Sequence, residues 1–357
     1  MKALVLAGGS GTRLRPITFT RAKQLVPVAN KPILFYGLEA IAAAGIREVG
    51  VVVGDTAPEV MAAVGDGAAW GIEVTYIPQD KPRGLAHAVV IAEEYMGGEP
   101  FVMYLGDNLI KDGITGLVRE FDVSEASDAH ILLAHVPNPT AFGVAEVDDG
   151  KVVRLVEKPA EPKSDLALVG VYLFRPAIFE AVNSIEPSAR GELEITDAIQ
   201  WLVDHGRVVT PHVIEGWWKD TGKLDDLLEA NRILLEDITT EIEGEIEDGV
   251  RIEGRVRIGR GSVIEGSSRL RGPICIGEDV RVVDSYIGPF TSLADGVQVL
   301  GSEIEHSIML QHSRLESVRG RVTDSLFGVG AVARTSASTP SANSFMVGDN
   351  SEVEIAR

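Results

Sequence analysis

The chain has 357 residues, of which 45% are hydrophobic and 24% are charged, as is usual for a folded protein of one or two domains. Its formal net charge of −20 argues against nucleic-acid and anionic-membrane partners, because such a surface repels both. The sequence has no apolar run near the ~20 residues that a membrane span needs, and the run after Met1 is too short for a signal segment. The single cysteine, Cys275, excludes a disulfide within the chain, so we expect a reducing compartment and a cytoplasmic protein.

The first half of the chain alternates short apolar runs with helical patterns. Predicted strands are Leu4–Ala7, Val49–Val53, Val74–Ile77 and Phe101–Leu105; predicted helices are Pro32–Ala44, Pro58–Val64 and Leu85–Met96. Strand–helix alternation predicts an α/β, Rossmann-like domain with a mostly parallel sheet. Because such sheets bind ligands beyond the carboxyl ends of their strands, the loops after the strands are the candidate site.

From about residue 241 the pattern changes to an aliphatic residue at every sixth position. The first seven positions are Ile246, Ile252, Ile258, Ile264, Leu270, Ile276 and Val282, and after a slip of one residue the period resumes at Ile287, Leu293 and Val299. Helices and simple strands have shorter periods, so this pattern predicts a left-handed parallel β-helix of hexapeptide repeats. The predicted domains are therefore residues 1–240, the catalytic part, and residues 241–357, a β-helix that is expected to serve assembly or regulation. Ser344–Val347 are expected to fold back and pack.

A glycine-rich loop directly follows the first predicted strand. It comprises Gly8-Gly9-Ser10-Gly11-Thr12-Arg13-Leu14, and the first 38 residues contain Lys and Arg but no Asp or Glu. Glycines let backbone N–H groups approach an anion, while Arg13 and Lys23 could hold a triphosphate. The loop lacks the Gly-Lys-Ser/Thr ending of a P-loop and the small residues of a dinucleotide fingerprint. Asp107 closes another predicted strand, a position suited to a metal ligand.

The run from Gly8 to Pro32 resembles the signature of sugar-1-phosphate nucleotidyltransferases. The closest likeness is to bacterial glucose-1-phosphate thymidylyltransferases of the long form, which has a C-terminal left-handed β-helix, and it covers essentially the whole chain. The resemblance implies transfer of a nucleotidyl group from dTTP to glucose 1-phosphate with Mg²⁺, giving dTDP-glucose and pyrophosphate. It also implies an in-line attack of the sugar phosphate on the α-phosphorus, for which no general base is needed because the attacking oxygen is already anionic.

The resemblance assigns roles to individual residues. Arg13 and Lys23 are the expected catalytic cations, and Asp107 and Asp220 the expected magnesium ligands. The expected nucleotide-binding residues are Leu6, Ala7, Gly8, Gly9, Gly11, Thr12, Gln79 and Gly84, with Gln79 reading the base through its amide. The expected sugar-phosphate-binding residues are Gly143, Glu157, Lys158, Val169, Gly170 and Arg190. Phe142 occupies a position where the family more often has Tyr. Phe lacks the tyrosine hydroxyl, so a hydrogen bond from that hydroxyl to the sugar is left open.

Several alternatives remain open from the sequence. The base could be uracil, because thymine differs from it by one methyl group, and the acceptor could be another sugar or a cyclitol phosphate. Acetyl transfer on the β-helix would need a histidine base, for which His306 and His312 are the candidates. A non-catalytic, effector-binding homologue would be expected to lack the cations and carboxylates named above. The seven histidines show no obvious constellation, and the flat flanks of a β-helix predict a homo-oligomer.

Overall fold

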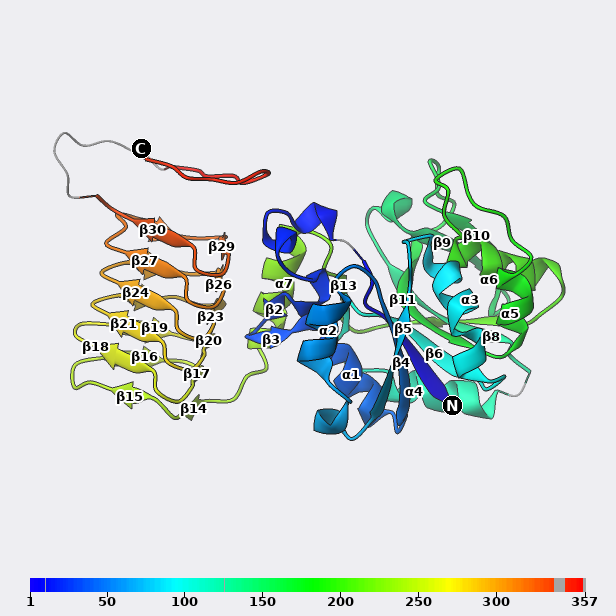
Figure 1. The fold of residues 1–357 in the computed structure, drawn as a ribbon, viewed down its shortest axis with the longest axis horizontal. Coiled ribbons are helices and arrows are strands. Elements are labelled where there is room, and N and C mark those ends of the chain that lie inside the picture. Colours follow the sequence, from blue (N-terminus) through cyan, green and yellow to red (C-terminus); the bar gives the residue numbers. More distant parts are fainter. Residues whose placement is uncertain (10, 125, 337–343, 356–357) are drawn as a thin grey trace. The chain divides into compact units, whose positions relative to one another are not determined.

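The computed structural model describes residues 1–9, 11–124, 126–336 and 344–355, and these divide into two units (Figure 1). Unit 1 comprises Met1–Ser10, Arg21–Leu25 and Ile33–Asp220, and unit 2 comprises Gly11–Thr20, Val26–Pro32 and Thr221–Arg357. No helix of the described residues is long and apolar enough to cross a membrane.

Unit 1 is built on a nine-stranded mixed sheet. Its main order is β10-β9-β11-β6-β1-β4-β5, with β8 beside β11 and β12 beside β8. The strands are β1 (Lys2–Leu6), β4 (Glu48–Val53), β5 (Glu73–Pro78), β6 (Phe101–Leu105), β8 (Ala129–His135), β9 (Gly143–Asp148), β10 (Lys151–Glu157), β11 (Leu166–Phe174) and β12 (Val209–Val213). Strands β6, β1, β4 and β5 are parallel, while β11 runs antiparallel to β6 and β8. The four predicted strands are therefore the parallel part of the sheet, with β5 at its edge.

Helices cover both faces of this sheet because its central strands are apolar on both sides. Leu4 of β1 packs with one set of helices, α3 (Leu85–Met96), α5 (Ala177–Val182) and α6 (Ile195–Asp204). Its neighbours Ala3 and Val5 pack with the other set, α1 (Ile33–Ala43), α2 (Ala57–Val64) and α4 (Thr115–Val123). Successive strand residues point to opposite faces, so the continuous apolar run of β1 supplies both cores. This arrangement confirms the predicted α/β, Rossmann-like fold.

Unit 1 also contains several smaller elements. They are the 3-10 helices η3 (Lys23–Leu25), η4 (Ala68–Trp70) and η5 (Pro139–Ala141), and the two-stranded sheet of β7 (Asn108–Ile110) and β13 (Trp218–Asp220). Unit 2 contains η1 (Thr12–Leu14), η2 (Ile17–Phe19), the short strands β2 (Pro27–Val28) and β3 (Lys31–Pro32), and α7 (Leu224–Leu235).

The remainder of unit 2 consists of three stacked parallel sheets, which confirms the β-helix predicted from the period of six (Figure 1). The first contains β14 (Glu241–Ile242), β17 (Val256–Ile258), β20 (Ile274–Ile276), β23 (Thr291–Leu293), β26 (Ile308–Met309) and β29 (Leu326–Phe327). The second contains β15 (Glu245–Ile246), β18 (Val263–Glu265), β21 (Arg281–Val283), β24 (Gln298–Leu300), β27 (Arg314–Glu316) and β30 (Val332–Arg334). The third contains β16 (Arg251–Glu253), β19 (Arg269–Arg271), β22 (Tyr286–Ile287), β25 (Glu303–Ile304) and β28 (Arg321–Val322).

The aliphatic residues of the period stack on their equivalents in the next coil. Ile258 lies beside Ile276, and Leu270 lies beside Ile287, so the one-residue slip is absorbed between two coils. These side chains are buried together in one core, whereas Ile246 at the first coil is only partly buried. The expectation that Ser344–Val347 pack back is wrong, because Phe345, Met346 and Val347 are exposed and nothing in the described chain covers them.

A buried asparagine joins α7 and the segment Val26–Pro32 to the β-helix. Asn231 is fully buried, and its Oδ1 accepts hydrogen bonds from the backbone N–H of Ala29 at 2.8 Å and from Oγ of Ser292 at 2.6 Å. Its Nδ2 donates to the backbone oxygen of Phe290 at 2.9 Å. Since burial would make each of these groups costly to leave unpaired, Asn231 links these parts of unit 2.

Replacing Asn231 with alanine is expected to lower the free energy of unfolding by about 3 kcal/mol, because three buried groups lose their partner. Urea unfolding followed by circular dichroism measures the loss. Asn138, which is exposed and accepts a hydrogen bond from Thr140 at 2.7 Å, provides the control, and Asn138→Ala should change the free energy of unfolding by less than about 0.5 kcal/mol. Equal effects in the two variants would contradict the linking role.

Candidate active site

The loop after β1 brings a lysine and a glutamine close to two glycines. A Cβ atom on Gly9 would lie 2.8 Å from Cε of Lys23, and one on Gly8 would lie 3.5 Å from Oε1 of Gln79. Ala7 donates its backbone N–H to β4 at 2.8 Å, which holds the loop at the carboxyl end of the parallel strands. A side chain at position 9 would displace the end of the lysine side chain, and four of the predicted residues meet here.

Gln79, the predicted base reader, is oriented by a histidine that sequence reasoning missed. Its Nε2 lies 3.0 Å from Nδ1 of His87, in the first turn of α3. Burial lowers the pKa of His87, and the nearby charge of Arg83 acts in the same direction, so the ring is neutral at pH 7 and Nδ1 can accept from the amide. The only signal in the sequence is that His87 follows Gly84 at the start of the helix.

Gln24 is a second residue that the sequence did not single out. Its side chain lies between two loops, 3.4 Å from a Cβ on Gly9 and 3.5 Å from a Cβ on Gly106. The residue is buried, and its Oε1 has no hydrogen-bond partner among the described residues. An unpaired buried acceptor costs about 1–3 kcal/mol, so a donor on a bound molecule would be favoured at this position.

Asp107, the first predicted metal ligand, is buried immediately after β6. Its Oδ2 is hydrogen-bonded to Nζ of Lys23, and Nδ2 of Asn108 donates to its Oδ1 at 3.3 Å. Burial by itself would raise the pKa of Asp107, but the charge and hydrogen bond of Lys23 outweigh it and hold the pKa below its ordinary value. The carboxylate is therefore ionised at neutral pH, as a metal ligand must be.

The β7–β13 sheet brings the second predicted ligand to the same place. Asp220 on β13 is paired with Asn108 on β7, so it lies opposite the residue that directly follows Asp107. Trp218 fixes this pairing by donating its Nε1–H to Oδ1 of Asn108 at 2.6 Å, and the hydroxyl of Tyr104 donates to the backbone oxygen of Asn108 at 3.2 Å. Two carboxylates, one of them buried and ionised, form a donor set that suits a hard divalent cation.

Three of the predicted sugar-phosphate residues form a charged cluster in unit 1. Glu157 lies at the end of β10. Its Oε1 is 3.3 Å from Nζ of Lys158 and 3.4 Å from Nη2 of Arg190. Thr196 donates to its Oε2 at 2.7 Å. Arg190 also donates to the buried carboxylate of Glu194 at 2.7 Å, and this hydrogen bond raises its pKa, so its charge is permanent. The cluster presents two partly exposed cations that could hold a phosphate.

One predicted glycine lies against this cluster, and another lies against Asn108, the residue that follows Asp107. A Cβ on Gly143 would lie 2.8 Å from Oγ1 of Thr196, and one on Gly170 would lie 2.7 Å from Nδ2 of Asn108. Gly170 lies where the pairing of β11 with β8 shifts register, next to the buried Val169. The Phe142 ring packs edge-on against Trp218, with 5.5 Å between ring centroids.

For the remaining predicted residues, the structure shows mainly backbone contacts and close approaches. Leu6 accepts a hydrogen bond from the backbone N–H of Gly106 at 2.9 Å. Gly84 has φ +101°, and a Cβ there would lie 2.3 Å from the backbone oxygen of Leu193, so only glycine fits. In unit 2, Gly11 and Thr12 begin η1, and Nη2 of Arg13 lies 3.0 Å from the Cβ position of Gly222.

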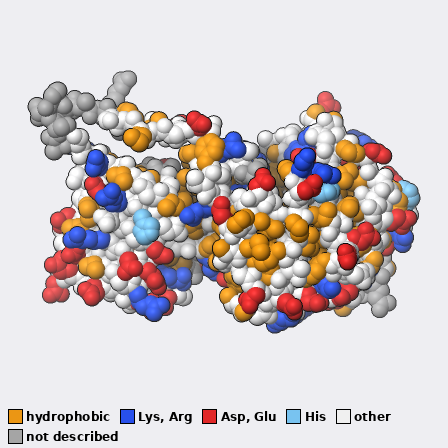
Figure 2. Space-filling model, viewed as in Figure 1, with side chains coloured by type: hydrophobic (Ala, Val, Ile, Leu, Met, Phe, Trp, Pro, Cys, Tyr) orange, Lys and Arg blue, Asp and Glu red, His pale blue; other side chains and the backbone are white. Residues whose placement is uncertain are grey.

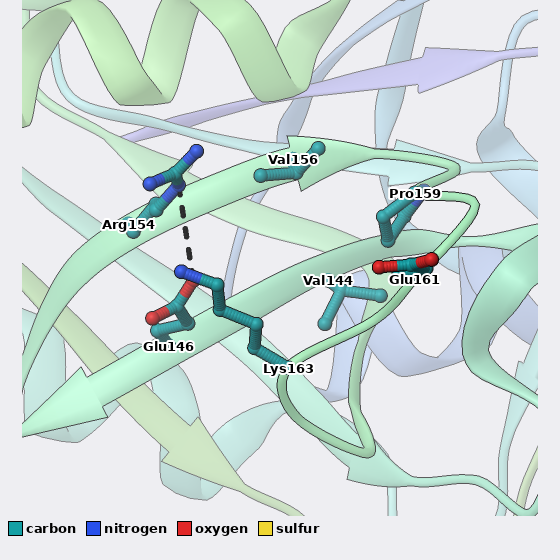
Figure 3. Close-up of a pocket in the computed structure, with 7 residues that line it drawn as sticks. All are labelled: Val144, Glu146, Arg154, Val156, Pro159, Glu161 and Lys163. Atoms are coloured by element: carbon teal, nitrogen blue, oxygen red, sulfur yellow. Dashed lines mark ion pairs between the residues drawn. The ribbon is translucent and has the colours of Figure 1, made fainter.

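A small pocket outside these residues lies on the β9–β10 hairpin (Figure 3). Val144 and Val156 line it, with charged side chains that include the Arg154–Glu146 ion pair at 3.7 Å. None of the predicted site residues lines it. Figure 2 shows Asp and Glu side chains scattered over the visible face, in keeping with the acidic net charge.

Comparison with known proteins identifies the family. The nucleotidyl transferase family model matches residues 2–237. The chain belongs to the nucleotidyl transferase family. Enzymes of this family generally use a divalent metal ion, and the resemblance inferred from the sequence is confirmed.

The relatives of this nucleotidyl transferase include proteins similar over the whole chain. It is 59% identical over 356 residues to the glucose-1-phosphate thymidylyltransferase of Streptomyces antibioticus, covering 99% of both chains. It is 55% identical over 357 residues to that of Streptomyces griseus, covering 100% of both chains. A solved Bacillus anthracis structure, described as a glucose-1-phosphate thymidylyltransferase in complex with a sucrose, is 37% identical with a TM-score of 0.63. That likeness covers 68% of this chain and 98% of the other.

Proposed function

We propose that this enzyme transfers the thymidylyl group of dTTP to glucose 1-phosphate, giving dTDP-glucose and pyrophosphate. The observation that carries this proposal is the full-length similarity to two glucose-1-phosphate thymidylyltransferases. The geometry of unit 1 supports it, because the nucleotide residues Gly8, Gly9 and Gln79 and the cations Lys158 and Arg190 border the same carboxyl edge of the sheet as Asp107.

In the proposed reaction a phosphate oxygen of the sugar phosphate attacks the α-phosphorus of dTTP as the bond to the β-phosphate oxygen breaks. No proton is moved, because the attacking oxygen is anionic and pyrophosphate leaves as an anion. Lys158 and Arg190 orient the attacking phosphate, and Glu157 accepts hydrogen bonds from sugar hydroxyls. Arg13 and Lys23 neutralise charge on the triphosphate, so the rate comes from positioning and electrostatic stabilisation.

We propose Mg²⁺ as the metal, held by Asp107 and Asp220, because these carboxylates are the hard oxygen ligands that Mg²⁺ prefers. When bound, it would supply positive charge to the phosphate oxygens. Lys23 already neutralises Asp107 in the structure, so the carboxylate stays ionised whether or not a cation is bound.

The test is pyrophosphate release in the presence of Mg²⁺, with glucose 1-phosphate and each of dTTP, UTP, ATP, CTP and GTP. We expect the highest kcat/KM with dTTP and a lower value with UTP, and the ratio of the two settles the base. Release only with another sugar or cyclitol phosphate would replace glucose as the acceptor. Absence of release with every pair would contradict the proposed reaction.

Gln79→Ala is expected to raise KM for dTTP at least roughly tenfold with little change in kcat, because the amide contacts a part of the nucleotide that does not react. KM for glucose 1-phosphate should stay the same. Gln298→Ala, on the β-helix, is the control and should leave both constants unchanged. A fall in kcat with an unchanged KM would contradict the proposed role of Gln79 in binding the base.

Acetyl transfer remains the alternative for the β-helix. Nδ1 of His306 lies 2.6 Å from Oδ1 of Asp324, while His312 is exposed at another turn, and both histidines have positive φ. These are positions of turn residues, and the geometry does not favour an acetyl-transfer site over a structural role. Turnover of acetyl-CoA would establish this activity.

We propose that residues 1–240 form the catalytic domain and that the β-helix, residues 241–357, serves assembly as a homo-oligomer in the cytoplasm. The segment 344–355, which follows the β-helix, supports assembly. It exposes the apolar side chains of Phe345, Met346, Val347, Val353 and Ile355. A second copy of the chain would remove them from water. Burial raises the pKa of the Cys275 thiol to about 11, which suits an unreactive core cysteine in a reducing compartment.

Light scattering on a size-exclusion column tests the assembly. The full chain should elute as an oligomer, and a chain that ends at residue 336 should elute as a smaller species. A monomeric full chain, or identical assembly of both chains, would contradict a role of the segment. Activity of each species in the pyrophosphate assay shows whether assembly affects catalysis.

A further inference from the structure

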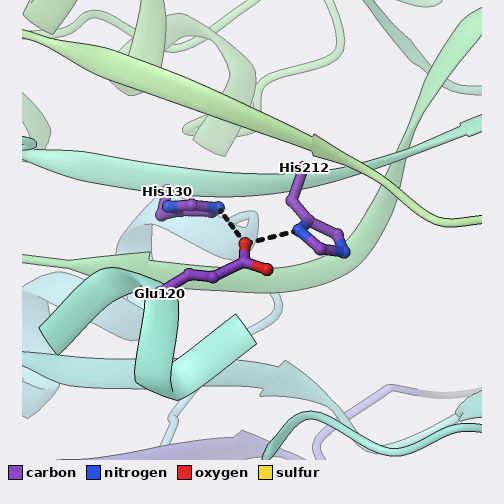
Figure 4. A group of neighbouring side chains, drawn as sticks. All are labelled: Glu120, His130 and His212. Atoms are coloured by element: carbon purple, nitrogen blue, oxygen red, sulfur yellow. Dashed lines mark hydrogen bonds and ion pairs between the residues drawn. The ribbon is translucent and has the colours of Figure 1, made fainter. Parts of the chain in front are cut away.

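Two histidines and a glutamate that are far apart in the sequence converge in unit 1 (Figure 4). Glu120 comes from α4, His130 from β8 and His212 from β12, the strand that pairs only with β8 and ends the sheet. One oxygen of Glu120, Oε2, lies 2.7 Å from Nδ1 of His212 and 3.8 Å from Nε2 of His130. One possible ligand atom from each residue lies within 4.8 Å of those of the other two.

The buried histidine of this group is oriented toward it. Nδ1 of His130 lies 3.1 Å from Oγ1 of Thr210, and that hydroxyl lies 2.8 Å from Oγ of Ser127. The residue is only 6% exposed, and its Nε2 has no hydrogen-bond partner among the described residues. If Nδ1 carries the proton that it shares with Thr210, the lone pair of Nε2 points toward Glu120 and His212. Orientation of an imidazole through its second nitrogen is usual at metal sites.

The protonation state of His130 also suits a ligand. Burial lowers its pKa, the neighbouring His212 lowers it further, and Glu120 opposes this only in part. The ring is therefore neutral at pH 7, which is the form that binds metals. A buried neutral imidazole that points an unpaired lone pair at a second imidazole and a carboxylate needs an explanation, because buried polar atoms are normally paired.

We propose that Glu120, His130 and His212 bind a divalent transition-metal ion, with Zn²⁺ as the best fit. Two imidazole nitrogens and one carboxylate oxygen are typical zinc ligands, whereas Mg²⁺ prefers oxygen ligands alone. In a tetrahedral site with bonds of about 2.0–2.1 Å, ligand atoms lie about 3.3 Å apart. Glu120 and His212, whose side chains are 51% and 32% exposed, can make the small adjustment, and water can complete the shell.

This site is separate from the proposed magnesium carboxylates. His130 pairs with Leu173 of β11, which in turn pairs with Val102 near the start of β6, whereas Asp107 follows the end of β6. The two positions are separated by at least about 10 Å along the strands. An ion there would connect α4 with β8 and the edge strand β12, and so would act on the structure of unit 1 rather than on the reacting phosphates.

Zinc binding by the untagged, chelator-treated full chain tests this proposal. Titration against a chromophoric chelator, in excess Mg²⁺ to saturate the carboxylate site, should show one tight Zn²⁺ per chain. His212→Gln and Glu120→Gln should each weaken it at least about 100-fold, and Thr210→Val by roughly 10–100-fold because His130 loses its orienting partner. X-ray absorption of the zinc form should show a shell of nitrogen and oxygen with two imidazoles.

The matched control is His135→Gln. His135 lies on the same strand as His130, is exposed, and has Asp165 at 2.9 Å. It belongs to no group of three possible metal ligands among the described residues. Its replacement should leave zinc binding unchanged. The proposal is overturned if the wild-type chain shows no saturable zinc site, or if binding survives both His212→Gln and Glu120→Gln. Neither result bears on the thymidylyl transfer, because pyrophosphate release is measured separately.

Discussion

Asp107→Asn is expected to lower kcat for pyrophosphate release by at least about 1000-fold, which corresponds to about 4 kcal/mol of lost transition-state stabilisation. The substitution removes the negative charge that the proposed metal ion needs. It also leaves Lys23 beside a neutral amide, although Lys23 normally forms an ion pair with this carboxylate. The loss of the metal charge is expected to dominate the effect on the rate.

The control for this variant is Asp204→Asn. Asp204 is exposed at the end of α6, where it accepts a hydrogen bond from Gln200 at 2.7 Å. Its replacement should change kcat by less than about twofold. Circular dichroism should show that both variants are folded. Activity of Asp107→Asn within tenfold of the wild type would exclude Asp107 as a metal ligand, and saturation at much higher Mg²⁺ would instead show weakened binding.

Arg13→Ala is expected to lower kcat by about 100–1000-fold, because a guanidinium placed on the triphosphate stabilises charge that develops in the transition state. Arg13→Lys should recover only part of the loss, since an ammonium group keeps the charge but cannot form the two parallel hydrogen bonds of a guanidinium. The measurement is again pyrophosphate release from dTTP and glucose 1-phosphate, with kcat and KM determined separately.

Arg15 offers a matched control two residues away. It is also exposed, and its guanidinium lies over the ring of Phe19, 4.8 Å from the ring centroid. Arg15→Ala should therefore leave kcat within about threefold of the wild type. Equal losses in the two variants would indicate that the general positive charge of the loop matters, and would contradict a specific contact of Arg13 with the triphosphate.

Much of the fold could be predicted from the sequence because its signals are local. The apolar runs before Gly8 and Asp107 predicted strands, and the residues just after a parallel strand necessarily lie at its carboxyl edge. The period of six from Ile246 to Val282 predicted the β-helix, since each repeat must bury its aliphatic residue against the next coil. The family resemblance then supplied roles for these residues, and these roles remain predictions.

Contacts that depend on tertiary packing could not be predicted in this way. The pairing of β7 with β13 places Asp220 opposite the residue that follows Asp107, and packing of α3 against the sheet brings His87 to Gln79. Neither contact has a spacing that a sequence pattern could reveal. Without the family resemblance, Asp220 would have been one carboxylate among many.

The sequence by itself determined four strands and three helices of the first half, the repeat of the β-helix and the family, because periodicity and glycine-rich turns depend on neighbours along the chain. Only the tertiary structure decided which polar groups meet. The seven histidines showed no constellation in the sequence, yet strand register and helix packing place His130 and His212 beside Glu120. The sequence likewise showed no sign of the role of Asn231, which is buried in the structure and has three hydrogen-bond partners. Sites of this kind arise from the folded geometry, which fixes both the distance between side chains and their access to water.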